Sequence, residues 1–236
     1  MNRFRTFFRK ISKNNTKTCF VLKCDIRKFF ANIDHIILKK ILVKHITDEN
    51  FLWLLSQVID SFHANTYFSH GVNMQSDTNS AVAENLTNHI YAIADICKGL
   101  PLGNLTSQLL VNIYMNEFDQ FVKRKLKVKY YIRYADDFVI LSEDKNELEN
   151  LLPKISNFLS ERLKLSLHPD KVFIKTIASG VDFLGWVHFP RHRVLRTSTK
   201  RRMLKQMKEN LRKEVRQSYL GMLKYGNTQK LREMVE

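Results

Sequence analysis

The stretch from Lys129 to Ser142 reads KYYIRYADDFVILS, and it decides the fold. Two short runs rich in aromatic and β-branched residues, KYYIRY and FVILS, are separated only by Ala135, Asp136 and Asp137. Runs of this composition at this separation are typical of a β-hairpin. The sequence therefore predicts an antiparallel hairpin that carries two adjacent carboxylates at its tip.

A second apolar run lies upstream and also ends in a carboxylate. CFVLKC, from Cys19 to Cys24, is a β-prone segment that leads directly to Asp25. Because successive strand residues point to opposite faces, usually only one of Asp136 and Asp137 faces a given site, and a carboxylate from another strand could meet it there. Clustered carboxylates repel one another unless a cation lies among them.

Hard oxygen ligands of this kind suit Mg²⁺, which keeps waters and binds substrate phosphates. Two such ions can activate an attacking hydroxyl and stabilise a leaving pyrophosphate. On spacing alone an alternative stays open, in which the Asp136–Asp137 pair is a hydrophilic turn and Asp25 caps a helix.

Apolar residues recur at helical spacing in four segments outside these strands. The expected helices run from Asp34 through His45, from Asp48 through Phe62, from the turn-rich GLPLGN (residues 99–104) through Val122, and from Asp144 through Leu163. In the last helix, Asp144 and Glu147 have the spacing of a capping box. Residues 63–98 are polar and weakly periodic, so we expect an irregular insertion that closes in a short helix near Ile90–Cys97.

The order of these elements predicts the fold class. A further β region runs from Leu165 through VDFLGWVHF, and the tail from Arg191 is basic and mostly helical. Strands and helices that follow one another without a regular βαβ alternation predict an α+β fold, in which an antiparallel sheet has helices packed on one face.

The amino-acid composition indicates a folded protein and the kind of molecule that it binds. Hydrophobic residues make up 44% of the 236, which excludes a disordered chain. A net charge of +16 points to a polyanion, nucleic acid first and an anionic membrane second. Three cysteines without a C-x-x-C pair predict reduced, buried thiols rather than a disulfide framework or a zinc site. With no secretory signal and no membrane span in the sequence, we expect a cytoplasmic protein.

Four motifs together resemble the reverse transcriptases. They are CDIRKFFANID, LPLGNLTSQ, YADDFVIL and FLGW, in the family's order over about residues 19–190. The resemblance implies a right-hand polymerase palm over residues 19–190, with the polar insertion at about 63–98. Residues 1–18 would be the basic stub of a largely missing fingers region. Residues 191–236 would be the basic, helical start of a thumb.

The resemblance also implies a function. The chain would be an RNA-directed DNA polymerase that adds deoxynucleotides to a primer 3′-hydroxyl on an RNA template. Its cofactor would be two Mg²⁺ ions, with Mn²⁺ as a possible substitute. Its partners would be an RNA template, a DNA or RNA primer and deoxynucleoside triphosphates, with room for an accessory protein and none for a membrane.

Particular residues inherit roles from the resemblance. Asp25 and Asp136 would be the principal metal ligands and Asp137 the accessory carboxylate. The backbone carbonyl of Ile26 would help to hold the metal that carries the triphosphate. Lys171 follows LSLHPD and would be the general acid that protonates the leaving pyrophosphate, or else a surface lysine.

Further positions would contact the nucleotide and the primer. Phe30 lies five residues after Asp25, where a bulky ring under the incoming sugar would exclude a 2′-hydroxyl. The segment along the nascent base pair would contribute Leu102, Gly103, Ser107 and Gln108. The primer-grip hairpin would contribute Phe183, Leu184, Gly185 and Trp186, where Trp186 packs either on the primer or in the core.

An aliphatic residue followed by G-x-x-x-S-Q is similar to the pattern of diversity-generating retroelement enzymes, which copy RNA with errors at adenines. Leu102 stands where most of the family has Gln. Replacing a hydrogen-bonding Gln beside the nascent base pair by Leu predicts looser base discrimination. Two alternatives stay open. One is a catalytically incomplete, nucleic-acid-binding palm fragment, because only 24 residues precede Asp25. The other is a defence-system or group II intron-like reverse transcriptase.

Overall fold

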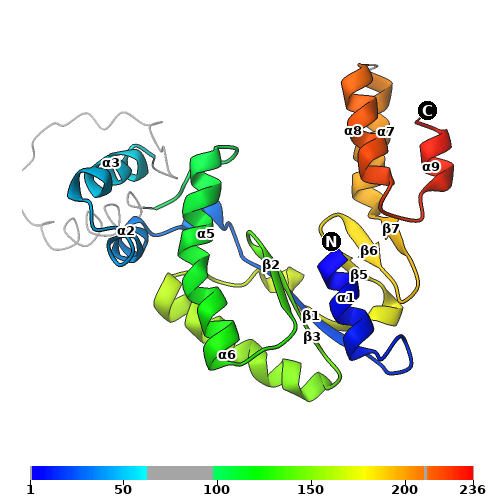
Figure 1. Cartoon of the computed structure of the whole chain (residues 1–236), viewed down its shortest axis with the longest axis horizontal. Coiled ribbons are helices and arrows are strands. Elements are labelled where there is room, and N and C mark those ends of the chain that lie inside the picture. The colour runs from blue at the N-terminus through cyan, green and yellow to red at the C-terminus, as the bar shows by residue number, and fades with distance from the viewer. Residues whose placement is uncertain (1, 63–97, 210–211, 236) are drawn as a thin grey trace, which may run out of the picture.

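The described part of the chain comprises residues 2–62, 98–209 and 212–235 of a computed structural model (Figure 1). The short helix expected near Ile90–Cys97, and the insertion up to residue 97, lie outside the described residues. No helix in the described ranges combines the length and the apolar character that crossing a bilayer requires.

Helices and strands alternate along the chain without a repeating βαβ unit. The helices are α1 (Asn2–Ile11), α2 (His35–Val43), α3 (Glu49–Asp60), α5 (Leu105–Gln120), α6 (Lys145–Leu163), α7 (Thr197–Glu209), α8 (Lys213–Leu223) and α9 (Gln229–Glu233). The strands are β1 (Phe20–Asp25), β2 (Tyr131–Tyr134), β3 (Asp137–Ser142), β4 (Phe173–Thr176), β5 (Val181–Phe183), β6 (Trp186–His188) and β7 (Arg193–Leu195). A π-helical turn, Phe121–Lys125, extends α5.

The central sheet has four strands in the order β2-β3-β1-β4, and every neighbouring pair is antiparallel. Strands β2 and β3 form the hairpin predicted from the sequence, and Tyr134 pairs with Asp137. The turn therefore consists of Ala135 and Asp136, and Ala135 takes a left-handed φ of 51°. An α+β fold with an antiparallel sheet is confirmed.

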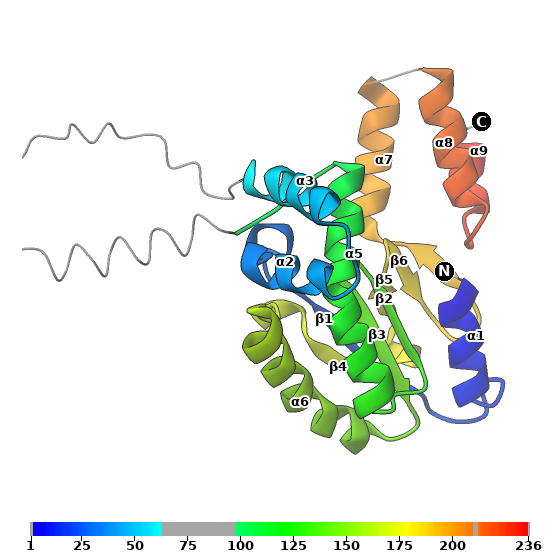
Figure 2. The same cartoon turned by 60° about the vertical axis from the view of Figure 1, so that its left-hand side comes forward.

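The two faces of this sheet pack against different partners because side chains alternate along each strand. Leu22, Cys24 and Phe138 join the core that the sheet shares with α5 and α6. Val21 and Val139 point the other way and join a second cluster. Figure 2 shows α5 and α6 on one side of the sheet, and α1 with the β5–β6 hairpin on the other.

Helix α1 covers part of the face that α5 and α6 leave open. Its buried residues Phe4, Phe8 and Ile11 recur at helical spacing and pack against the second cluster. The ring of Phe4 also lies 5.7 Å from the ring of Phe183 and 4.5 Å from the ring of His188. The N-terminal residues thus join the central sheet to the strands that follow it.

A second antiparallel sheet has the order β5-β6-β7 and leads into the C-terminal helices. Strand β7 was not predicted, because the tail from Arg191 was expected to be mostly helical. Arg193 and Leu195 are buried, whereas Val194 between them is only half-buried. Burial that alternates from one residue to the next is typical of a strand. Trp186 is 1% exposed and packs with four buried side chains: Leu195, Met203, Leu223 and Val235.

The start of α6 differs from the predicted capping box. Asp144 does cap the helix, since its carboxylate accepts from the backbone N–H of Asn146 at 2.8 Å. Glu147, however, accepts from the hydroxyl of Ser142, and that same hydroxyl oxygen accepts the backbone N–H of Asp144 at 3.0 Å. The interposed Ser142 hydroxyl therefore replaces the direct reciprocal bond.

Substitution of Gly226 tests the packing of the C-terminal unit. A Cβ at this position would overlap the ring of Trp186, so Gly226→Ala should lower the free energy of unfolding by about 1–3 kcal/mol. Gly221, inside α8, has open space around its Cβ position, and Gly221→Ala should raise stability by about 0.5–1 kcal/mol. Chemical denaturation of both variants checks this. Equal effects would contradict the packing of Trp186 against Gly226.

Candidate active site

Three carboxylates lie at one end of the central sheet. The antiparallel pairing of β1 with β3 places Asp25 directly opposite Asp137. The backbone N–H of Ile26 donates to the carbonyl of Asp136 at 3.2 Å, which ties the end of β1 to the hairpin turn. The structure therefore brings together the four residues expected at a metal site: Asp25, Ile26, Asp136 and Asp137.

Burial and the repulsion between neighbouring carboxylates raise the pKa values of Asp136 and Asp137. Burial raises the pKa of Asp136, and the neighbouring charge of Asp25 adds to this effect. Burial likewise raises the pKa of Asp137 to about 6, against the lowering influence of Lys23. Placing a positive charge among these groups would therefore stabilise their ionised forms.

Lys23 is a site residue that the sequence analysis missed. Only 5% of the residue is exposed, and its Nζ lies 3.2 Å from Oδ1 of Asp137. Lysine is almost never this buried unless it is paired, so the ion pair explains its position. The available signal was a lysine in the otherwise apolar run CFVLKC, two residues before Asp25 and therefore on the same side of the strand.

Lys171 contacts Asp25 from the segment just before β4, which pairs with β1 on the side away from β3. Its Nζ lies 3.3 Å from both carboxylate oxygens of Asp25, and its side chain is half exposed. Backbone bonds hold the preceding segment there, since the N–H of His168 donates to the carbonyl of Asp25 at 2.8 Å and the N–H of Arg27 donates to that of Ser166 at 2.9 Å. Lys171 thus lies beside a carboxylate of the site.

The donor set suits a divalent cation with oxygen ligands. Asp25, Asp136 and Asp137 supply hard carboxylate oxygens. A cation among them would offset the repulsion between their charges and the burial that raises the pKa values of Asp136 and Asp137. Within the described ranges, no group of three or more His, Cys, Asp or Glu side chains is gathered closely enough to hold a metal by itself. Mg²⁺ is usually bound by one or two carboxylates together with waters and substrate phosphates, so the residues fit that ion.

Phe30 lies next to the turn that leads into α5. The backbone N–H of Leu100 donates to the carbonyl of Phe30 at 2.8 Å, and the ring of Phe30 meets the ring of Phe29 edge-on at 5.4 Å. Phe29 is 3% exposed and belongs to the core, whereas Phe30 is half-buried. Buried His35 also contacts the carbonyl of Gly99 at 2.7 Å through Nε2.

The residues expected along the nascent base pair divide into two groups. Leu102 is 78% exposed, and Gly103, with φ of 94°, and Gln108 are also exposed. Ser107 is 2% exposed and faces the core. Leu102, Gly103 and Gln108 are therefore accessible to a ligand, and Ser107 is a packing residue in this conformation.

The FLGW segment forms the turn between β5 and β6. Phe183 pairs with Trp186, and the two turn residues, Leu184 and Gly185, have φ values of 53° and 79°. Phe183 and Trp186 are each 1% exposed, and the guanidinium of Arg193 lies 5.2 Å from the centre of the Trp186 ring. Trp186 therefore packs in the core, and the accessible part of the motif is its half-exposed turn.

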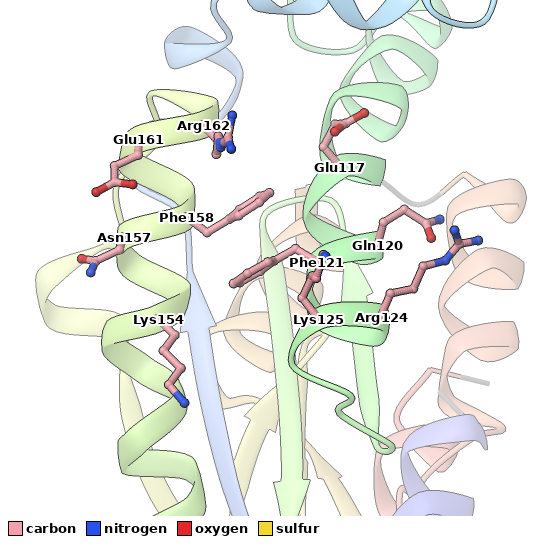
Figure 3. Close-up of a pocket in the computed structure, with 10 residues that line it drawn as sticks. All are labelled: Glu117, Gln120, Phe121, Arg124, Lys125, Lys154, Asn157, Phe158, Glu161 and Arg162. Carbon is pink, nitrogen blue, oxygen red and sulfur yellow. The ribbon is translucent and has the colours of Figure 1, made fainter.

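A cavity of about 560 Å³ lies on a different part of the molecule, between the end of α5 and α6 (Figure 3). The rings of Phe121 and Phe158 stack inside it at 4.1 Å, and cations such as Arg124 and Lys154 line its sides. None of the site residues expected from the sequence lines this cavity.

Lys23→Met tests the buried ion pair. The substitution keeps the length of the side chain but leaves the carboxylate of Asp137 buried without its partner, so the free energy of unfolding should fall by about 3 kcal/mol. In the double variant with Asp137→Asn, part of the loss should return because no charge is then stranded. Urea unfolding of the wild type, both single variants and the double variant measures the coupling. Additive losses would contradict the pairing.

Comparison with known proteins places these residues in a family context. A family model described as reverse transcriptase (RNA-dependent DNA polymerase) matches residues 2–188. The COX1/OXI3 intron 2 protein of Saccharomyces cerevisiae is 24% identical over 230 residues, covering 74% of this chain and 24% of that protein. Protein YkfC of Escherichia coli is 26% identical over 213 residues, covering 77% of this chain and 48% of that protein.

The fold has a counterpart among solved structures. Telomerase from Candida albicans, solved with a fragment of telomeric RNA, aligns with a TM-score of 0.50 and 14% identity. The alignment covers 83% of this chain and 34% of the telomerase chain. This chain spans about a quarter and about half of the length of the two curated relatives named above. The family model spans most of the chain and both strands that carry the carboxylates, so the chain belongs to the reverse transcriptase family.

Proposed function

We propose that this chain is the palm of an RNA-directed DNA polymerase and that Asp25, Asp136 and Asp137 form its catalytic centre. The observation that carries the proposal is the pairing of β1 with β3, which gathers three carboxylates from two chain segments at one end of the sheet. Membership of the reverse transcriptase family supports the same reaction.

Each residue at the site has a chemical part in the proposal. Asp25 and Asp136, with the carbonyl of Ile26, would hold two Mg²⁺ ions, or Mn²⁺ in their place, and Asp137 would be the accessory carboxylate. Such ions supply charge stabilisation to the attacking 3′-hydroxyl and the leaving pyrophosphate when bound. Lys171, as an ammonium beside Asp25, would donate its proton to the leaving oxygen.

The C-terminal helices offer a surface for the phosphates of a primer–template duplex. Between Arg191 and Gln217 there are eleven Lys or Arg and two Glu. On α7 the basic side chains are exposed: Lys200, Arg201, Arg202, Lys205 and Lys208. Exposed cations on one helix bind phosphates without sequence preference, which suits a polymerase that copies any template. Such a surface supports the RNA template and primer as partners.

The second candidate is a nucleic-acid-binding palm without catalysis. The basic surface of α7 would serve it equally well. The crowded carboxylates favour the enzyme, because repulsion among Asp25, Asp136 and Asp137 has no use in a protein that only binds phosphates. Nucleotide incorporation separates the two candidates.

Asp25→Asn and Asp136→Asn should each reduce nucleotide incorporation by roughly 10³-fold, because each removes a charged metal ligand. The thermal midpoint should not fall, since losing one charge relieves repulsion. The measurement is primer extension on poly(rA)–oligo(dT) with Mg²⁺. Asp144→Asn is a matched control outside the site, where Asn caps α6 as well as Asp does. Full activity in either site variant would remove the metal-site assignment.

Phe30→Ala should admit ribonucleotides, because the bulk of the ring is the proposed barrier to a 2′-hydroxyl. The preference for a deoxynucleotide over its ribonucleotide, measured as the ratio of kcat/KM values, should fall by roughly 10-fold or more. Phe30→Tyr keeps the bulk and should keep the ratio. An unchanged ratio in Phe30→Ala would mean that Phe30 only packs against Phe29.

The proposal extends to a retroelement with error-prone copying. Leu102 is exposed on the turn before α5 and offers no hydrogen bond to a base pair. Leu102→Gln should therefore lower errors opposite template adenine by roughly two- to tenfold, the worth of one hydrogen bond. Sequencing of the cDNA copied from a defined RNA measures this. An equal error spectrum in both proteins would favour an intron-like or defence-system reverse transcriptase.

A further inference from the structure

Arg133 is a buried cation beside the candidate site, on the strand β2 that leads into the carboxylate turn. Its side chain is 8% exposed and forms a two-point ion pair with Asp119 of α5. Nε donates to Oδ1 of Asp119 at 2.9 Å, and Nη2 donates to Oδ2 at 2.7 Å. Two parallel bonds of this kind fix the plane of the guanidinium as well as its position.

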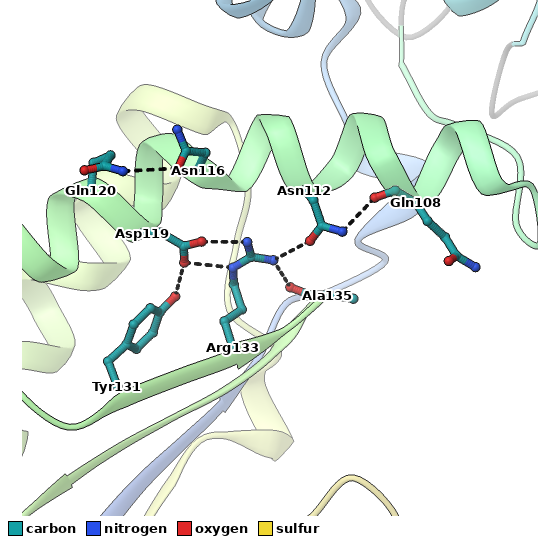
Figure 4. Close-up of polar contacts among 8 residues, drawn as sticks. All are labelled: Gln108, Asn112, Asn116, Asp119, Gln120, Tyr131, Arg133 and Ala135. Atoms are coloured by element: carbon teal, nitrogen blue, oxygen red, sulfur yellow. Dashed lines mark hydrogen bonds and ion pairs between the residues drawn. The ribbon is translucent and has the colours of Figure 1, made fainter. Parts of the chain in front are cut away.

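The third nitrogen of the guanidinium reaches the turn itself. Nη1 of Arg133 donates to the carbonyl of Ala135 at 3.1 Å and to Oδ1 of Asn112 at 3.3 Å (Figure 4). Ala135 has φ of 51°, a conformation that costs an L residue about 1 kcal/mol or more. The contact therefore holds a strained peptide that immediately precedes Asp136.

Other side chains complete the network. The hydroxyl of Tyr131 donates to Oδ1 of Asp119 at 2.7 Å, and burial raises the pKa of Tyr131, so the phenol stays protonated. The amide of Asn112 donates to the carbonyl of Gln108 at 2.9 Å. Bonds thus run continuously from the N-terminal half of α5, where Gln108 lies, to the turn between β2 and β3.

We propose that the Asp119–Arg133 pair is a positioning device for the catalytic centre. It fastens the Ala135–Asp136 turn to α5, so that the metal-binding carboxylate and the helix along the nascent base pair keep one relative position. This inference rests on the proposed function. In this proposal Arg133 and Asp119 contact neither the substrate nor the metal. They act on the catalytic centre only through the bond from Arg133 to the carbonyl of Ala135.

Stability alone does not account for this arrangement. A buried ion pair is often no more stabilising than apolar side chains of similar volume, so a strand–helix contact needs no guanidinium. What the guanidinium adds is three directed nitrogens in one plane, two for Asp119 and one for the turn. A lysine would keep the charge and lose this geometry.

Arg133→Lys is the direct test, since it keeps the positive charge beside Asp119 and removes the fork. Hydrogen exchange by mass spectrometry should show at least a tenfold faster exchange in the peptide spanning residues 134–138, with β1 and α6 unchanged. Primer extension should slow by about 10- to 100-fold, because a misplaced catalytic group loses rate steeply. The Mg²⁺ concentration for half-maximal rate should rise several-fold. A purely structural role would not move that Mg²⁺ requirement.

Two further variants keep the test decisive. Asp119→Asn keeps the size of the side chain but removes its charge. It should also speed hydrogen exchange in residues 134–138, and it serves as the test if Arg133→Lys does not fold. Lys39→Met breaks a different ion pair between two helices, Lys39 with Asp60 at 2.6 Å, and should leave the turn and the Mg²⁺ requirement unchanged.

Unchanged exchange in the turn would overturn the proposal, whatever the polymerase activity. An unchanged rate and Mg²⁺ requirement in an active protein would also overturn it. If the wild-type chain extends no primer, the proposed function fails, and the exchange result alone decides whether Arg133 holds the turn.

Discussion

The register between β1 and β3 is the constraint on which the rest of this structure depends. It sets Asp25 opposite Asp137 and, in the same ladder, turns Leu22 and Cys24 toward the core shared with α5 and α6. A slip of one residue would move every side chain of β1 to the other face, exposing apolar groups and separating the carboxylates. The same backbone hydrogen bonds therefore specify both the packing of the core and the positions of the site residues.

Around that register the chain places carboxylates and lysines close together. Three carboxylates face two lysines, of which Lys23 is buried against Asp137 and Lys171 is half exposed beside Asp25. Lys23 comes from the same strand as Asp25, whereas the segment that carries Lys171 is held by backbone bonds to residues 25–27. Arg133, on the far side of the turn, holds the peptide before Asp136. Lys23 and Asp25 of β1, Asp137 of β3 and Arg133 of β2 thus lie on strands that also contribute buried side chains to the core.

Much of this arrangement could be predicted from the sequence, and the failures have physical causes. The hairpin and the antiparallel α+β fold follow from the local pattern of KYYIRYADDFVILS and from element order. Strand β7 could not be predicted in this way. It has only three residues, too few to show an alternating pattern within a basic sequence that is otherwise typical of helices. The prediction of a direct capping box between Asp144 and Glu147 was wrong, because the hydroxyl of Ser142 bonds both the backbone N–H of Asp144 and the carboxylate of Glu147. Lys23 and Arg133 were missed because each pairs with a residue of another element, Asp137 of β3 and Asp119 of α5, and local sequence patterns do not reveal such pairs.

We propose that the C-terminal end of β1 and the β2–β3 turn form one metal-dependent centre. Fe²⁺ in place of Mg²⁺, with ascorbate and peroxide, cuts a polypeptide backbone close to the bound ion. Cuts are expected in two separate segments, residues 24–27 and 134–138. Excess Mg²⁺ should suppress them and Asp25→Asn should abolish them. Cuts in only one of these segments, or cuts that persist in Asp25→Asn, would contradict it.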